Sequence, residues 1–171
     1  VASGWRIIRY DGRGMGSSDR EVTDFSLEAR LRDLEAVVDH LALERFPLCG
    51  YGQGGPTAIL YTLRHPERVS HLVLVNSFAS GSAYYEKIPA MRTVIGLRDM
   101  AEEQWEFFTL TLASAIGGFG DAVAAQKTAA LLRGSMSPAA FLAFVEEARK
   151  VDLLDALPGV SVPTLVVVDT S

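Results

Sequence analysis

The stretch LCGYGQGGP, residues 48 to 56, constrains the fold of this chain more than any other feature. It joins a short apolar run, typical of a buried strand, to an apolar segment with helical spacing. Four glycines fall within residues 50–55, and glycine is the residue that best tolerates the backbone of a sharp turn. The stretch therefore predicts a buried strand, a tight turn and a helix packed closely on that strand.

Strand-like and helix-like segments alternate along the rest of the chain. The strand-like runs are apolar throughout, as parallel strands are, and the helix-like runs repeat leucine and valine every three or four residues. Ser26 is placed to cap the first helix. The alternation predicts an α/β protein with a parallel sheet. We expect strands at 5–10, 45–49, 71–76 and 162–168, helices at 26–43, 54–65, 100–116, 121–133 and 138–149, and an irregular segment at 77–89.

Composition excludes several classes of partner. The net charge of −5 argues against nucleic acid or an anionic membrane surface as the main partner. No apolar run reaches the ~20 residues that a membrane helix needs. The single cysteine excludes an internal disulfide and implies no oxidising compartment. We expect a cytoplasmic protein with no cofactor, no metal and no nucleic-acid or membrane partner.

Several motifs in the right order resemble the α/β-hydrolase superfamily. YDGRGMGSSD (10–19) is similar to the loop after the family's fourth strand. Residues 49–77 resemble its fifth strand, nucleophile elbow, following helix and sixth strand, and residues 153–167 resemble the return from a helical cap into its seventh strand. The chain is most similar to the hydrolase-like domains that accompany bacterial adenylate cyclases and regulatory proteins.

This resemblance implies a division of the chain and a partial fold. It predicts an α/β-hydrolase core at 1–77 and 150–171, and a helical cap at 78–149. Because the motifs begin at the family's fourth strand and end just after the seventh, we expect a middle fragment. It would lack half of the oxyanion hole and the histidine that follows the family's eighth strand.

The position of the family's nucleophile is occupied by Gly52. The elbow pattern is G-x-S-x-G, whereas this chain has G-x-G-x-G, and glycine has no side chain that could attack a substrate. The resemblance implies that the backbone N–H of Gln53 would still face an oxyanion. Asp169 is the carboxylate nearest to the family's acid position, although it falls a little early. We expect no intact catalytic set, and structural roles for His40, His65 and His71.

Other readings of the glycines and of Cys49 are weaker. A phosphate cradle would need an acidic residue about 20 positions further on, and none occurs there. Cys49 lies in an apolar strand with no nearby cation to lower its pKa, which predicts an inert, buried thiol. The second glycine-rich loop, at 12–16, is expected to be a turn that Arg13 and Asp19 hold in place.

Three aromatic residues are candidates for a ligand pocket. Tyr51 lies next to Gly52 in the sequence, and Trp105 and Phe108 share a stripe at helical spacing. Such a stripe is also typical of a plain apolar core. We expect a small ester or acyl ligand if the pocket exists.

Three functions stay open from the sequence. The chain could be an α/β-hydrolase-fold protein that is inactive because position 52 is glycine, a regulatory or ligand-sensing domain, or a competent serine hydrolase in which glycine replaces the serine.

The strand edges predict how copies associate. In the family, a third strand lies between the fourth and the fifth, so the strand at 5–10 lacks its neighbour here. It could pair with 45–49, with another copy or with a separate chain. We expect a homo-oligomer built through strand edges.

Overall fold

The protein is described by a computed structural model that covers residue 4 and residues 6–117 and 119–168. The described residues form a three-stranded parallel sheet in the order β1-β2-β3. Its strands are β1 (Phe46–Tyr51), β2 (Val69–Val75) and β3 (Thr164–Val167). This arrangement confirms the predicted α/β class and parallel sheet.

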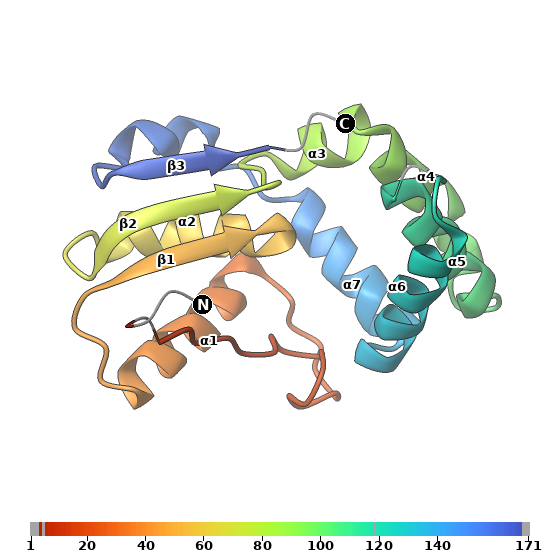
Figure 1. Ribbon diagram of the computed structural model, residues 1–171, viewed down its shortest axis with the longest axis horizontal. Coiled ribbons are helices and arrows are strands. Elements are labelled where there is room, and N and C mark those ends of the chain that lie inside the picture. The colour runs from red at the N-terminus through yellow and green to blue at the C-terminus, as the bar shows by residue number, and fades with distance from the viewer. Residues whose placement is uncertain (1–3, 5, 118, 169–171) are drawn as a thin grey trace.

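Two helices cover one face of this sheet. They are α1 (Leu27–His40) and α2 (Gly55–Arg64), and Figure 1 shows α2 directly behind β1 and β2. Ser26 caps α1 as predicted, because its side chain accepts a hydrogen bond from the amide of Ala29. The apolar stripe of α1 packs with Tyr61 of α2 and with the start of β2. The buried members of this cluster are Leu31, Leu34, Val38, Tyr61 and Val69.

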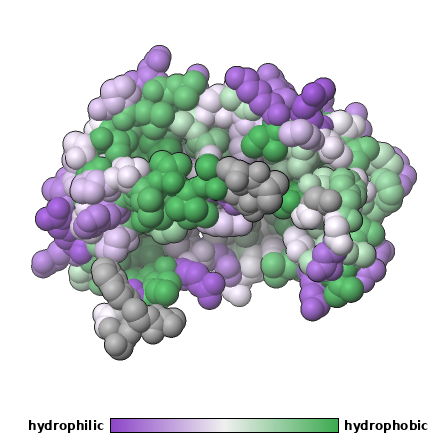
Figure 2. Space-filling model, turned by 45° about the horizontal axis from the view of Figure 1, so that its top comes forward, coloured by the Kyte–Doolittle hydropathy of each residue, from purple (hydrophilic) through white to green (hydrophobic). Residues whose placement is uncertain are grey.

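The opposite face of the sheet carries no helix in the described part of the chain (Figure 1). Cys49 is exposed, so the prediction of a buried thiol is wrong. The error arose because an apolar strand was assumed to be covered on both faces. All four residues of β3 are exposed, and hydrophobic surface is visible over this part of the molecule in Figure 2.

The remaining helices gather beyond the carboxyl ends of the strands (Figure 1). They share an apolar core that includes Phe108, Phe141 and Phe144 and also takes in Phe25. The division into a hydrolase core and a cap at 78–149 stays a prediction. We call these helices the helical group: α3 (Gly81–Lys87), α4 (Pro89–Leu97), α5 (Trp105–Ile116), α6 (Ala122–Ser135) and α7 (Pro138–Arg149). Three short 3-10 segments complete the described elements: Gly52–Gly54, Arg98–Met100 and Leu154–Gly159.

The segment expected to be irregular contains α3 and the start of α4. Ser80 caps α3 by accepting a hydrogen bond from the amide of Ala83. Gly81 then allows α3 to approach α7, since a Cβ at this position would overlap the carbonyl oxygen of Ala148. Sequence reasoning missed α3 because this short helix begins with a glycine. Glycine has a low helix propensity, so its presence argues against a helix unless close packing requires it.

The predicted strand at 5–10 is wrong in its described part. Residues 6–10 adopt no regular structure, and all five are exposed. A strand is stabilised by hydrogen bonds to a neighbour, and this segment has no strand partner among the described residues. Its apolar residues, such as Ile7 and Ile8, are therefore not enough to make it a strand.

Within the described residues, no single helix has the length and apolar character needed to cross a membrane. Only α6 and α7 taken together pass such a test, and they are bent by 95° at their break.

The open edge of β3 generates a prediction about assembly. Strand edges with free N–H and C=O groups pair with other chains, and a lysine on the edge opposes such pairing. We expect light scattering behind a sizing column to give at least twice the chain mass of 18.5 kDa. Val166→Lys should shift the protein toward monomer. Val123→Lys, at a similarly exposed site on α6, should not.

A monomer at tens of micromolar that unfolds cooperatively would contradict this expectation. Equal masses for the two lysine variants would show that copies associate through a different surface.

Candidate functional site

The turn between β1 and α2 (residues 51–55, called the Gly52 turn from here on) is where the sequence placed the site. The chain leaves β1, makes one 3-10 turn over Gly52–Gly54 and enters α2 with Pro56 in its first turn. Gly52 has a φ of 50°, in the left-handed region that favours glycine. A Cβ built on Gly52 meets nothing within 4 Å, so a side chain there would point into open space.

Close packing of α2 on the sheet depends on two other glycines. A Cβ on Gly50 would lie 2.7 Å from the Cα of Gly55 and 2.9 Å from the Cβ of Ala58. A Cβ on Gly55 would overlap the hydroxyl of Ser77. A Cβ on Gly54 would face open space, so Gly54 takes no part in this close packing.

Gln53 connects the Gly52 turn to helices on both sides. Its side-chain Nε2 donates to the hydroxyl of Tyr85 on α3 at 3.0 Å. Its main-chain oxygen accepts from Nη1 of Arg30 on α1 at 3.3 Å. Burial raises the pKa of Tyr85 well above its ordinary value, so its hydroxyl stays protonated at neutral pH. The turn is thereby tied to α1 and to the helical group.

Aromatic rings lie beside these contacts. Phe78 stacks on Tyr84 with ring centroids 4.3 Å apart, and Tyr84 meets Tyr85 edge-on at 5.2 Å. Sequence reasoning missed these rings because they lie in the segment expected to be irregular. The capping pattern that Ser80 begins was the available signal for α3.

The predicted aromatic candidates are not gathered at the turn. Tyr51 ends β1 and is 70% exposed. Trp105 and Phe108 lie on α5, stacked on each other at 5.7 Å, and Phe108 is buried against Phe141. The stripe on α5 thus packs in the core of the helical group. Of the two interpretations of the stripe, a ligand pocket and a plain apolar core, this position agrees with the apolar core.

The histidines lie away from the turn. His65 follows α2 at the end opposite Gly52, where its Nε2 lies 2.9 Å from Glu35 and its ring packs on Tyr61. His71 pairs with Pro47 near the amino ends of the strands, and His40 is exposed at the end of α1. Asp169 lies outside the described residues. No cluster of His, Cys, Asp or Glu in the described part of the chain could hold a metal ion.

The glycine-rich loop at 12–16 is held in place as expected, and Arg13 contributes through its side chain. Its Nε and Nη2 donate to the two carboxylate oxygens of Asp33 at 2.7 and 2.8 Å, and its Nη1 donates to the carbonyl of Asp24. Asp19 takes part through its main-chain oxygen, which accepts from the amide of Gly14.

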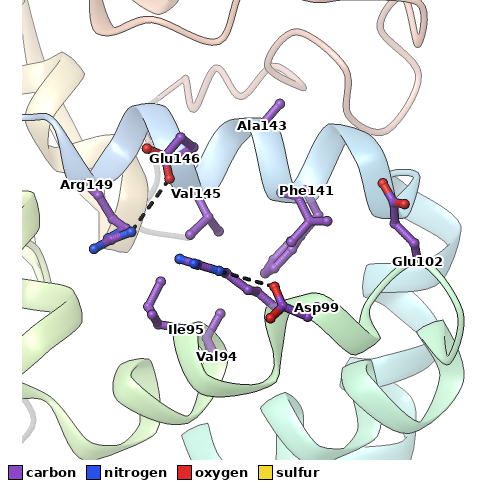
Figure 3. Close-up of a pocket in the computed structure, with 11 residues that line it drawn as sticks. Val94, Ile95, Asp99, Glu102, Phe141, Ala143, Val145, Glu146 and Arg149 are labelled. Carbon is purple, nitrogen blue, oxygen red and sulfur yellow. Dashed lines mark ion pairs between the residues drawn. The ribbon is translucent and has the colours of Figure 1, made fainter.

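A pocket of about 790 Å³ opens between α4 and α7 (Figure 3). Val94 and Ile95 face Phe141 and Val145 across it. Its volume suits a small molecule, but the residues that line it come from α4, α7 and the segment 98–102, and not from the Gly52 turn. Two ion pairs lie among the residues that line the pocket. Nε of Arg98 is 3.5 Å from Oδ1 of Asp99, and Nη1 of Arg149 is 3.6 Å from Oε2 of Glu146.

Comparison with known proteins places this strand–turn–helix unit in a family. The sequence profile of the alpha/beta hydrolase fold matches residues 1–152. The chain belongs to the alpha/beta hydrolase family. One relative is a 2-hydroxy-6-oxononadienedioate/2-hydroxy-6-oxononatrienedioate hydrolase of Cupriavidus pinatubonensis, 37% identical over 90 residues. The match covers 52% of this chain and 31% of that relative.

Solved structures show the same fold. A bromoperoxidase from Bacillus anthracis superposes with a TM-score of 0.76 at 18% identity, covering 93% of this chain and 61% of that one. An esterase from Exiguobacterium antarcticum superposes with a TM-score of 0.69 at 24% identity, covering 91% and 59%. This alpha/beta hydrolase chain therefore spans about three fifths of the solved structures that it resembles.

The positive φ of Gly52 predicts a stability cost for serine. In Gly52→Ser the side chain meets no neighbour, so the cost is backbone strain alone, about 1–3 kcal/mol of unfolding free energy. Gly54→Ser is a matched control, because Gly54 has a φ of −78° and equally open space. We expect the control to change stability by less than about 0.5 kcal/mol in urea melts. Equal melts for the two variants would contradict the left-handed conformation at position 52.

Proposed function

We propose that the Gly52 turn of this alpha/beta hydrolase chain holds a small acyl or ester ligand without forming a covalent bond to it. The observation that carries this proposal is Gly52, which offers no oxygen or sulfur for attack on a carbonyl carbon. The backbone N–H of Gln53 is the donor that would face a carbonyl oxygen, as in an oxyanion hole.

The surroundings of the turn support binding more than chemistry. A serine at this position would need a base within hydrogen-bond reach, and the described histidines lie elsewhere. The half-buried rings of Phe78 and Tyr84 offer aromatic surface beside Tyr85, whose hydroxyl accepts from the side chain of Gln53. A domain that binds such a ligand without catalysis would act as a ligand-sensing or regulatory module. We further propose that it is a cytoplasmic protein.

A second candidate is a competent serine hydrolase in which glycine has replaced the nucleophile. The open space over Gly52 favours it, because a serine side chain would fit there without a clash. The sequence of the parent gene decides between the two. Serine at position 52 with a histidine downstream would support the hydrolase, and glycine would support the ligand-binding domain.

The proposal predicts no turnover of short-chain p-nitrophenyl esters above the buffer background. Gly52→Ser should not create activity, since no described histidine lies near the turn to activate it. Cys49→Ala is the necessary control, because the exposed thiol of Cys49 could react with such esters directly. A rate that survives repurification and disappears in Cys49→Ala would show that Cys49 is the reactive group.

Binding is tested separately with 4-nitroacetophenone, a ketone that resembles the ester and cannot be hydrolysed. We expect it to shift the NMR signal of the Gln53 amide, with smaller shifts at Gly96 on α4. Shifts spread evenly over the protein, or absent at Gln53, would contradict a ligand site at the turn.

A further inference from the structure

Among the described residues, a buried cation next to the Gly52 turn has no acidic partner in an ion pair. Arg30 on α1 is only 8% exposed. Its guanidinium carbon lies 5.0 Å from the centre of the Phe144 ring, and its Nη1 donates to the main-chain oxygen of Gln53. Its Nε and Nη2 are buried, and neither donates to any group among the described residues. Buried charges are normally paired, because removing an ion from water is costly.

The unpaired atoms form one edge of the planar guanidinium group. This edge presents two parallel N–H donors that match the two oxygens of a carboxylate. Arg13 in the same chain shows the match, since its Nε and Nη2 bind the two oxygens of Asp33. Arg30 presents the same edge, and no described residue supplies an acceptor for it.

The groups that the structure describes near Arg30 do not neutralise its charge. Glu147 lies close enough for its charge to act on Arg30, but its Oε1 accepts from Nζ of Lys150 at 2.6 Å, and it forms no ion pair with Arg30 among the described contacts. Tyr10 and Tyr85 also lie nearby. Both are phenols, which are neutral at pH 7 because an ordinary tyrosine has a pKa of about 10, and burial raises the pKa of Tyr85 further.

We propose that Arg30 binds a carboxylate of the ligand that occupies the Gly52 turn. The inference rests on the proposed function and narrows its ligand class to acyl compounds that also carry a free carboxylate. Arg30 contacts the main chain of Gln53, so a carboxylate on its Nε and Nη2 lies beside the turn. Both nitrogens are closed to solvent, and the packing around them, which includes Phe144 of α7, has to open before the carboxylate enters.

The test compares adipate, a dicarboxylate, with adipamide, its neutral diamide of the same length. Adipate should raise the unfolding temperature and shift the Gln53 amide signal, and adipamide should do neither. In Arg30→Met, which keeps the length of the side chain without its charge, the Kd for adipate should rise by at least about tenfold, the equivalent of one charge-assisted hydrogen bond. Arg32→Met is the matched control on the same helix, since the Arg32 side chain is 60% exposed.

Two further readouts separate binding from folding. Without ligand, Arg30→Met should unfold at a higher temperature than the parent, because it removes an uncompensated buried charge. Arg30→Lys keeps the charge but lacks the paired donors, so it should also bind adipate more weakly than the parent.

Adipate binding that Arg30→Met and Arg30→Lys both retain would overturn the role of Arg30. Equal binding of adipate and adipamide would overturn the carboxylate requirement. If 4-nitroacetophenone shifts the Gln53 amide and adipate does not, the carboxylate site is wrong while the proposed function stands. If neither compound shifts it, the proposed function fails and this inference fails with it.

Discussion

The close approach of α2 to β1 is the constraint on which the rest of the structure depends. A Cβ on Gly50 would overlap the backbone of Gly55, and a Cβ on Gly55 would overlap Ser77, which follows β2, so a side chain at either position would force α2 away from the sheet. The short connection then has to reverse direction within three residues, which places Gly52 in the left-handed region. Helix packing and turn geometry therefore impose glycine at three positions for three different steric reasons.

This packing also decides which surfaces are left open. With α1 and α2 on one face and the helical group beyond the carboxyl ends of the strands, the second face of the sheet has no cover among the described residues (Figure 1). Cys49 and the whole of β3 are exposed as a result. Apolar strands with open faces and edges are unusual in a monomer, because they leave both apolar surface and backbone groups unpartnered.

A small network of hydrogen bonds joins the Gly52 turn to α1 on one side and to the helical group on the other. Gln53 bonds to Tyr85 of α3 through its side chain and to Arg30 of α1 through its main chain. Arg30 in turn lies over the ring of Phe144 in α7. A movement of the helical group would thus alter contacts made by the residue that follows Gly52. Under the proposed ligand-binding function, these contacts would connect an occupied turn to the helical group.

The sequence by itself determined the parts that depend on local chemistry. Glycine spacing at 50–55 predicted the tight strand-to-helix turn, the Ser26 cap predicted the start of α1, and apolar runs predicted a parallel sheet. Tertiary structure decided what depends on neighbours. It left residues 6–10 without a strand partner, exposed Cys49, formed α3 because Gly81 fits against α7, and buried Arg30 beside Gln53. A periodic pattern shows that a segment has an apolar face, but only the packed chain determines what, if anything, covers it.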